Sequence, residues 1–266
     1  MSSTRIAKRF AYLEKRDKKA FIPFIVAGDP DLETTEQLIV GLERIGADII
    51  ELGVPFSDSI ADGPVILNAI SRALDKGTTL HSIFLMVEHI RSKTEVPIVF
   101  MISYNLIYNY GINRFVRICK QVGVDGVIVP DLPVEESLEL HKEMNNDIDL
   151  IYLVSPESDD NRIKLLKDRA SGFIYFISIK GITGIRNEID ISIKERVQRA
   201  REILGIPVVQ GFGISKQEHI TAIKSYVDGV VVGSAIVKSI EENLADPDIV
   251  KIVLDRTKPL IQSLKT

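Results

Sequence analysis

Gly123-Val124-Asp125-Gly126-Val127 joins the end of a helical pattern to a short β-branched run, and two other stretches of the sequence look like it. They are Gly46-Ala47-Asp48-Ile49-Ile50 and Val227-Asp228-Gly229-Val230. Two of the three begin with a glycine, which is typical of the point where a helix ends and a strand follows. Together they form a weak internal repeat of a βα unit, which predicts an α/β protein.

Eight short apolar runs recur along the 266-residue chain and are predicted to be strands. They are 20–27, 48–52, 98–102, 126–129, 150–154, 173–178, 207–210 and 228–232. The runs are apolar on both faces, which indicates a parallel sheet buried on both sides. Their strict alternation with helical patterns, without a Gly/Ser-rich linker, predicts a single (β/α)8 TIM barrel domain over residues 1–266. A doubly wound parallel sheet is the alternative, because a strand count alone does not establish closure.

Two segments predict helices in addition to those of the eight βα units. Residues Thr4–Leu13 place Ile6, Phe10 and Leu13 in helical register, which predicts an extra helix before the first strand. Residues Val65–Lys93, after the second strand, carry two helical patterns divided by glycine and threonines. The second βα unit is therefore expected to hold one helix more than the fold needs.

Composition excludes several classes of protein. The 33 basic and 37 acidic residues give a net charge of −4, which argues against bulk attraction to nucleic acid or an anionic membrane. The single cysteine, Cys119, allows no intrachain disulfide and fits a reducing compartment. No secretory signal is seen, and the charge-free stretch 96–113 carries polar groups that a bilayer would leave unsatisfied. We expect a cytoplasmic protein with no nucleic-acid or membrane partner.

In a barrel of this kind, the active site lies at the carboxyl ends of the strands. Glu51 lies in the second strand, where its carboxyl would enter the barrel mouth, and burial raises the pKa of a carboxyl toward acid–base work. Asp62 lies in the loop after that strand and could face it. The structural alternatives are that Glu51 pairs with a lysine and that Asp62 is a turn residue.

Glycine-rich turns follow the last three strands. Gly211-Phe212-Gly213 and Gly233-Ser234 come after strands seven and eight, where barrels commonly bind phosphate through backbone N–H groups and helix N-termini. Loop six, 178–184, carries Gly181 and Thr183 and is expected to be a mobile lid. The four histidines all fall in helical stretches, so no metal site or histidine-activated nucleophile is predicted.

Several segments together resemble the tryptophan synthase alpha chain family over nearly the whole chain. They are 20–24 leading to 27–30, 51–58, 61–64, 131–136, 211–215 and 233–238. The resemblance implies a lyase that cleaves indole-3-glycerol phosphate to indole and glyceraldehyde 3-phosphate for tryptophan biosynthesis. It places the family's catalytic pair on Glu51 and Asp62 and its assisting tyrosine on Tyr175. The implied phosphate site comprises Gly184, Phe212, Gly213, Gly233 and Ser234.

The same resemblance implies a partner. The recipient of the indole would be the beta chain, and two alpha and two beta chains would form one heterotetramer. The pyridoxal phosphate would belong to the beta chain, so this chain is expected to use no cofactor. The contact is expected at the carboxyl face of the barrel, near loop two (residues 54–64), loop three around 105–109 and the loop 130–133. Three positions depart from the family pattern: Ile179 replaces an arginine, Ser59 a proline and Ser103 a tyrosine.

Two other functions remain open at this point. A sugar-phosphate isomerase on the same barrel would need acidic residues at the ends of strands one and five. Strand one offers Asp29, but strand five ends in Ser155-Pro156. A regulatory subunit that keeps the fold and has lost turnover is the non-enzyme alternative, and release of indole by the isolated chain separates it from the enzyme.

Overall fold

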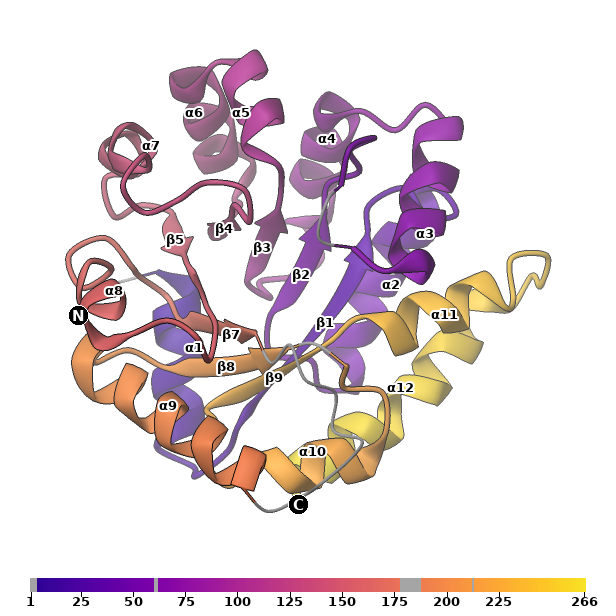
Figure 1. Cartoon of the computed structure of the whole chain (residues 1–266). Helices are drawn as coiled ribbons and strands as arrows, with labels where there is room; N and C mark the ends of the chain where they lie inside the picture. Colours follow the sequence, from indigo (N-terminus) through magenta and orange to yellow (C-terminus); the bar gives the residue numbers. More distant parts are fainter. Residues whose placement is uncertain (1–3, 60–61, 178–187, 212) are drawn as a thin grey trace.

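Parallel strands ringed by helices make up the computed structural model, which describes residues 4–59, 62–177, 188–211 and 213–266 (Figure 1). The described residues form nine strands, each within or one residue beyond a predicted run. They are β1 (Ala20–Val26), β2 (Ile50–Gly53), β3 (Ile98–Met101), β4 (Gly126–Ile128), β5 (Asp149–Ile151), β6 (Leu153–Val154), β7 (Ile174–Ile177), β8 (Val208–Gly211) and β9 (Gly229–Val232).

The sheet closes on itself through the segment predicted as the fifth strand. Its first half, β5, pairs with β4, and its second half, β6, pairs with β7. Tyr152 lies between the halves, and its carbonyl accepts the N–H of Tyr175 at 3.0 Å. The sheet order β5-β4-β3-β2-β1-β9-β8-β7-β6 therefore begins and ends on one stretch of chain. A doubly wound sheet would have two separate edges, so the predicted (β/α)8 barrel is confirmed.

Helices cover the outside of the barrel (Figure 1). Following the strands in order, they are α2 (Leu32–Ile45), α4 (Leu80–Ile90), α6 (Ile112–Val122), α7 (Leu138–Met144), α8 (Asp160–Lys164), α9 (Glu188–Leu204), α10 (Gln217–Ile223), α11 (Ser234–Glu241) and α12 (Ile249–Lys265). The extra helix after strand two is confirmed as α3 (Pro64–Asp75), ahead of α4. Two helices were not predicted: α5 (Tyr104–Tyr110) replaces the expected loop around 105–109, and α12 is a second helix after the last strand.

The predicted N-terminal helix is α1 (Arg5–Glu14), which packs against the amino-terminal end of the barrel. Ile6, Phe10 and Leu13 join the core inside the barrel, and the Phe10 ring lies 5.8 Å from that of Phe173. Gly126 allows this approach, because a Cβ there would lie 2.9 Å from the Ile6 side chain. In Figure 1, α1 lies behind β7 and β8. The helix therefore closes the end opposite the expected active site.

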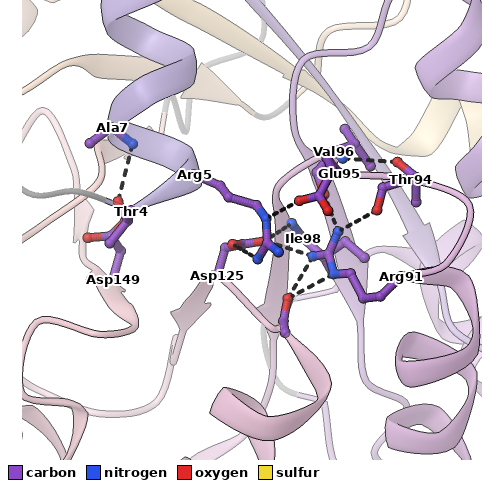
Figure 2. A network of polar contacts seen from close by, with 11 residues as sticks. Thr4, Arg5, Ala7, Arg91, Thr94, Glu95, Val96, Ile98, Asp125 and Asp149 are labelled. Carbon is purple, nitrogen blue, oxygen red and sulfur yellow. Dashed lines mark hydrogen bonds and ion pairs between the residues drawn. The ribbon is translucent and has the colours of Figure 1, made fainter.

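The aspartates of the three repeated stretches lie at this same end. Each carboxylate accepts the N–H of the first or second residue of a neighbouring strand and pairs with at least one arginine. The N–H contacts are Phe21 N to Asp48 at 2.7 Å, Ile98 N to Asp125 at 2.8 Å and Val208 N to Asp228 at 2.8 Å. The arginines are Arg9 on Asp48, Arg5 and Arg91 on Asp125, and Arg201 on Asp228 (Figure 2 shows the Asp125 group). The repeated aspartates thus supply hydrogen-bond acceptors for backbone N–H groups at strand ends that would otherwise lack one.

Candidate active site

Glu51 is a buried carboxyl group inside the barrel. Its neighbours Ile50 and Leu52 pack in the outer core against the helices, so the alternation along β2 turns Glu51 inward. The residue is 1% exposed, and neither carboxyl oxygen has a hydrogen-bond partner among the described residues. Burial, with a smaller contribution from the charge of Asp62, raises the pKa of Glu51 to about 8. The carboxyl therefore holds a proton at neutral pH, and the described residues provide no lysine partner for it.

Asp62 lies at the mouth of the barrel, just before α3. It is half-buried and lines a cavity of about 330 Å³ whose walls are mostly apolar, including Phe24 and Ile177. The Ser59 hydroxyl donates to Oδ2 of Asp62 at 2.5 Å. Because the Asp62 charge raises the pKa of Glu51, the two carboxyl groups are close enough to interact. The structure thus brings the expected pair together at one site.

Tyr175 lies in the same cavity, on β7. Burial, followed by the charges of Glu51 and Asp62, raises its pKa well above the ordinary value of a tyrosine, so its hydroxyl stays neutral. Gly211, on the neighbouring β8, makes room for the ring: a Cβ there would lie 2.1 Å from the Tyr175 hydroxyl oxygen. The sequence pattern assigned Gly211 to a phosphate loop, whereas the structure shows that it accommodates the tyrosine.

Replacing Gly211 with alanine is expected to displace the Tyr175 ring and lower kcat at least tenfold, because small misplacements in an active site are costly. Steady-state kinetics would measure the loss of kcat, and circular dichroism would measure the fraction of folded protein. Gly63→Ala is the matched control, since Gly63 has an ordinary φ of −79° and nothing within 4 Å of its added Cβ. Full activity of Gly211→Ala would show that the ring position does not matter.

The described part of the expected phosphate site lies on two neighbouring strand ends. Gly213 follows β8, and Gly233 and Ser234 follow β9, which pairs with β8. Gly233 is the N-cap of α11, whose first turn receives no side-chain cap, and Ser234 is exposed. Helix N-terminal N–H groups left free in this way suit an anion. Gly184, Phe212 and the lid residues Gly181 and Thr183 lie outside the described residues.

His219 supports this site, although the sequence pattern gave none of the histidines a role. Its Nδ1 lies 3.2 Å from the carbonyl oxygen of Gly213 and 3.3 Å from the backbone N of Ser215, so it donates to the carbonyl when protonated and accepts the Ser215 N–H when it is not. The ring comes from the first turn of α10 and reaches back to the turn that carries Gly213. His219 follows Ser215 by four residues, about one helical turn, and this spacing in the sequence could have identified His219 as a supporting residue.

The two glycines are constrained differently. Gly213 has φ +72°, a left-handed conformation that other residues rarely adopt, while a Cβ there would meet nothing within 4 Å. A Cβ on Gly233 would instead lie 3.2 Å from the Phe24 side chain. For Gly213 the constraint is therefore the backbone turn itself.

Gly213→Leu is expected to raise KM for indole-3-glycerol phosphate several-fold while changing the affinity for indole much less, because the distorted turn would misplace the phosphate-binding N–H groups. Steady-state kinetics and indole titration would measure the two effects. Equal losses for both ligands would mean that the fold, rather than the phosphate site, had been damaged.

Ser103 also lines the mouth cavity and links two of its loops. Its hydroxyl donates to Oδ2 of Asp131 at 2.6 Å and accepts the N–H of Asn105 at the start of α5. The N–H of Tyr104 donates to the other Asp131 oxygen at 2.8 Å. This departure from the family pattern thus ties α5 to the loop after β4. Among the described residues, no group of three or more His, Cys, Asp or Glu side chains could hold a metal ion.

A closed (β/α)8 barrel with a protonated carboxyl inside its mouth and a carboxylate and tyrosine nearby defines an acid–base enzyme for a small substrate. A family model described as tryptophan synthase alpha chain matches residues 10–263. The chain belongs to the tryptophan synthase alpha chain family.

Individual relatives and solved structures lead to the same family. The tryptophan synthase alpha chain of Alkaliphilus metalliredigens is 45% identical over 91% of both chains. The structure of tryptophan synthase subunit alpha from Legionella pneumophila matches with a TM-score of 0.90, at 32% identity over 98% of both chains. A tryptophan synthase complex from Pyrococcus furiosus contains a chain that matches with a TM-score of 0.82, at 36% identity over 92% of this chain and 99% of that one.

Family membership sets the reaction. The chain is a carbon–carbon lyase of tryptophan biosynthesis that cleaves indole-3-glycerol phosphate to indole and glyceraldehyde 3-phosphate. The isomerase alternative is therefore wrong. No helix in the described ranges has the length and apolar character needed to cross a membrane.

Proposed function

We propose that Glu51, Asp62 and Tyr175 carry the cleavage of indole-3-glycerol phosphate in this chain. One observation carries the assignment: Glu51 is buried inside the barrel mouth, its pKa is raised to about 8, and no described residue hydrogen-bonds its carboxyl group. A carboxyl group that is protonated at neutral pH, yet close to losing its proton, can act first as an acid and then as a base.

The first step is transfer of the Glu51 proton to the indole carbon that bears the glycerol chain. That carbon becomes tetrahedral, and the positive charge moves to the ring nitrogen of the indolenine. Asp62 accepts the hydrogen bond of the indole N–H and stabilises this charge in a mouth with few other polar groups.

The second step uses the carboxylate that the first step leaves. Glu51 removes a proton from the glycerol hydroxyl next to the bond to be broken. The O–H electron pair becomes the carbonyl of glyceraldehyde 3-phosphate, and the carbon–carbon electrons return to the indole ring. Glu51 is protonated again, so the cycle needs no other proton source. Tyr175, neutral and beside the carboxyl pair, assists by orienting the substrate.

The phosphate would be held by backbone N–H groups of Gly184, Phe212, Gly213, Gly233 and Ser234, with Gly181 and Thr183 in the closing loop. The uncapped first turn of α11 supports this placement. Release of indole from indole-3-glycerol phosphate by the purified chain and by its Glu51 and Asp62 variants tests the proposal, and variants as active as the wild type would contradict it.

We also propose that this chain forms an α2β2 complex with the tryptophan synthase beta chain, which would hold the pyridoxal phosphate, and that it needs no cofactor of its own. The Pyrococcus furiosus match is to a tryptophan synthase complex. At the carboxyl face, Tyr108 on α5 is 67% exposed within the stretch expected to meet the beta chain, and tyrosine is enriched at protein interfaces. Residues 1–266 would act as one barrel domain, in the cytoplasm.

Binding of the beta chain is expected to raise kcat for cleavage at least about fivefold, a typical coupling between sites, because ordering of loop two would position Asp62. Sedimentation of mixed chains and cleavage rates with and without the beta chain would measure this. Tyr108→Ala should weaken the complex and leave the isolated chain active. Neither complex nor activation with the cognate beta chain would contradict the partner assignment.

A further inference from the structure

The hydroxyl of Ser59 makes a short contact with the side chain of Asp62. Ser59 Oγ donates to Asp62 Oδ2 at 2.5 Å, and both residues are half-buried and line the mouth cavity. A carboxylate beside mostly apolar walls loses hydration and is stabilised by any donor that the protein supplies. Hydrogen bonds to an ionised acceptor are among the strong ones, so this contact is able to fix the carboxylate.

The contact also assigns different tasks to the two oxygens of Asp62. With Oδ2 engaged by Ser59, the described residues leave Oδ1 for a donor in the cavity. We propose that Ser59 is a positioning residue that holds the Asp62 carboxylate so that one oxygen faces the indole N–H of the substrate. The inference rests on the proposed role of Asp62. It gives the hydroxyl at this position a function that a proline could not supply, because proline has no side-chain donor.

A neighbouring pair in the same loop shows what is particular about this contact. Ser57 Oγ donates to Asp58 Oδ2 at 2.8 Å, and both residues are exposed, although Asp58 also borders the mouth cavity. Ser57 and Asp58 are adjacent in the chain, so their contact constrains one local turn. The Ser59 bond instead joins the chain before and after residues 60–61, and therefore ties Asp62 to the β2 side of the loop.

The first arm of the test removes the hydroxyl. Ser59→Ala is expected to lower kcat about tenfold, with KM for indole-3-glycerol phosphate changed less than about threefold, since the charge of Asp62 matters most in the transition state. Ser59→Thr keeps the donor and should retain at least about a third of the wild-type kcat. Ser57→Ala, the matched loss of a serine hydroxyl, should change the kcat of the isolated chain by less than about twofold.

The second arm asks whether the effect passes through Asp62. In an Asp62→Asn background, adding Ser59→Ala should change kcat by less than about twofold, because the positioned charge is already gone. If Asp62→Asn alone were nearly neutral, the proposed function of Asp62 would fail. If Asp62→Asn were severe and Ser59→Ala neutral, only the role of Ser59 would be overturned.

A third variant separates hydrogen bonding from stiffness. Ser59→Pro restricts the backbone and supplies no donor. We expect it to lose about as much kcat as Ser59→Ala. Wild-type kcat in Ser59→Pro would show that the loop needs stiffness and not the hydroxyl, and would overturn the inference. Circular dichroism melting of each variant confirms that the compared proteins are folded.

Discussion

Replacing Glu51 with glutamine is expected to lower kcat for indole release by about 10²–10⁴-fold, the usual cost of losing a general acid–base group. Glutamine keeps the shape of the side chain, and no described hydrogen bond to the carboxyl would be lost. What it removes is the transferable proton. KM should change little, because the group acts on the reacting bonds. Stopped and continuous indole assays of the isolated chain measure the effect, and more than about a tenth of wild-type activity would refute the assignment.

The raised pKa of Glu51 adds a pH signature to this variant. The free wild-type enzyme should lose kcat/KM as pH rises through about 8, because Glu51 then gives up the proton needed for the first step. The residual activity of Glu51→Gln should lack this decline. A wild-type profile that stays flat through pH 9 would contradict the role of Glu51 as the acid.

The free energy of unfolding should depend on the same ionisation of Glu51. The folded pKa of Glu51 lies above the ordinary value of 4.5, so between 4.5 and about 8 the folded state binds more protons than the unfolded state. The free energy of unfolding therefore falls as pH rises across this window. Glu51→Gln has no such proton to lose and should gain stability relative to wild type from pH 5 to pH 9. Urea unfolding at both pH values measures the difference.

Asp62→Asn is the second large effect, with an expected loss of about 10²–10³ in kcat. The amide can still accept the indole N–H, but it supplies no negative charge to balance the positive ring nitrogen. Asp58→Asn is the control: Asp58 borders the same cavity but is exposed, so removing its negative charge from this loop should cost much less. Nearly full activity of Asp62→Asn would mean that the loop residue has a structural role alone.

The local sequence was enough to predict the α/β architecture and the inward carboxyl. Strands buried on both sides must be apolar throughout, so a polar residue such as Glu51 within the run at 48–52 was a visible exception. The helical registers of Thr4–Leu13 and of Val65–Lys93 likewise predicted α1 and α3 correctly, because periodicity reports which face is buried. Asp62 was identified as a candidate by its loop and by resemblance.

Contacts between distant segments were decided by the tertiary structure. Pairing of β5 and β6 with strands on opposite sides closes the barrel, and no pattern within 149–154 indicates both partners. The repeated aspartates appeared as a sequence repeat, but their hydrogen bonds to neighbouring strands exist only once those strands lie side by side.

The same division holds at the active site. Sequence determined which side chains could do the chemistry, since a carboxyl or a hydroxyl is fixed by residue type. The fold decided their protonation and their partners: it buries Glu51, sets Asp62 near it, places Tyr175 over Gly211 and directs His219 to the Gly213 turn. A pKa depends on the solvent and charges that surround a group, and those surroundings are assembled from strands and loops far apart in the chain.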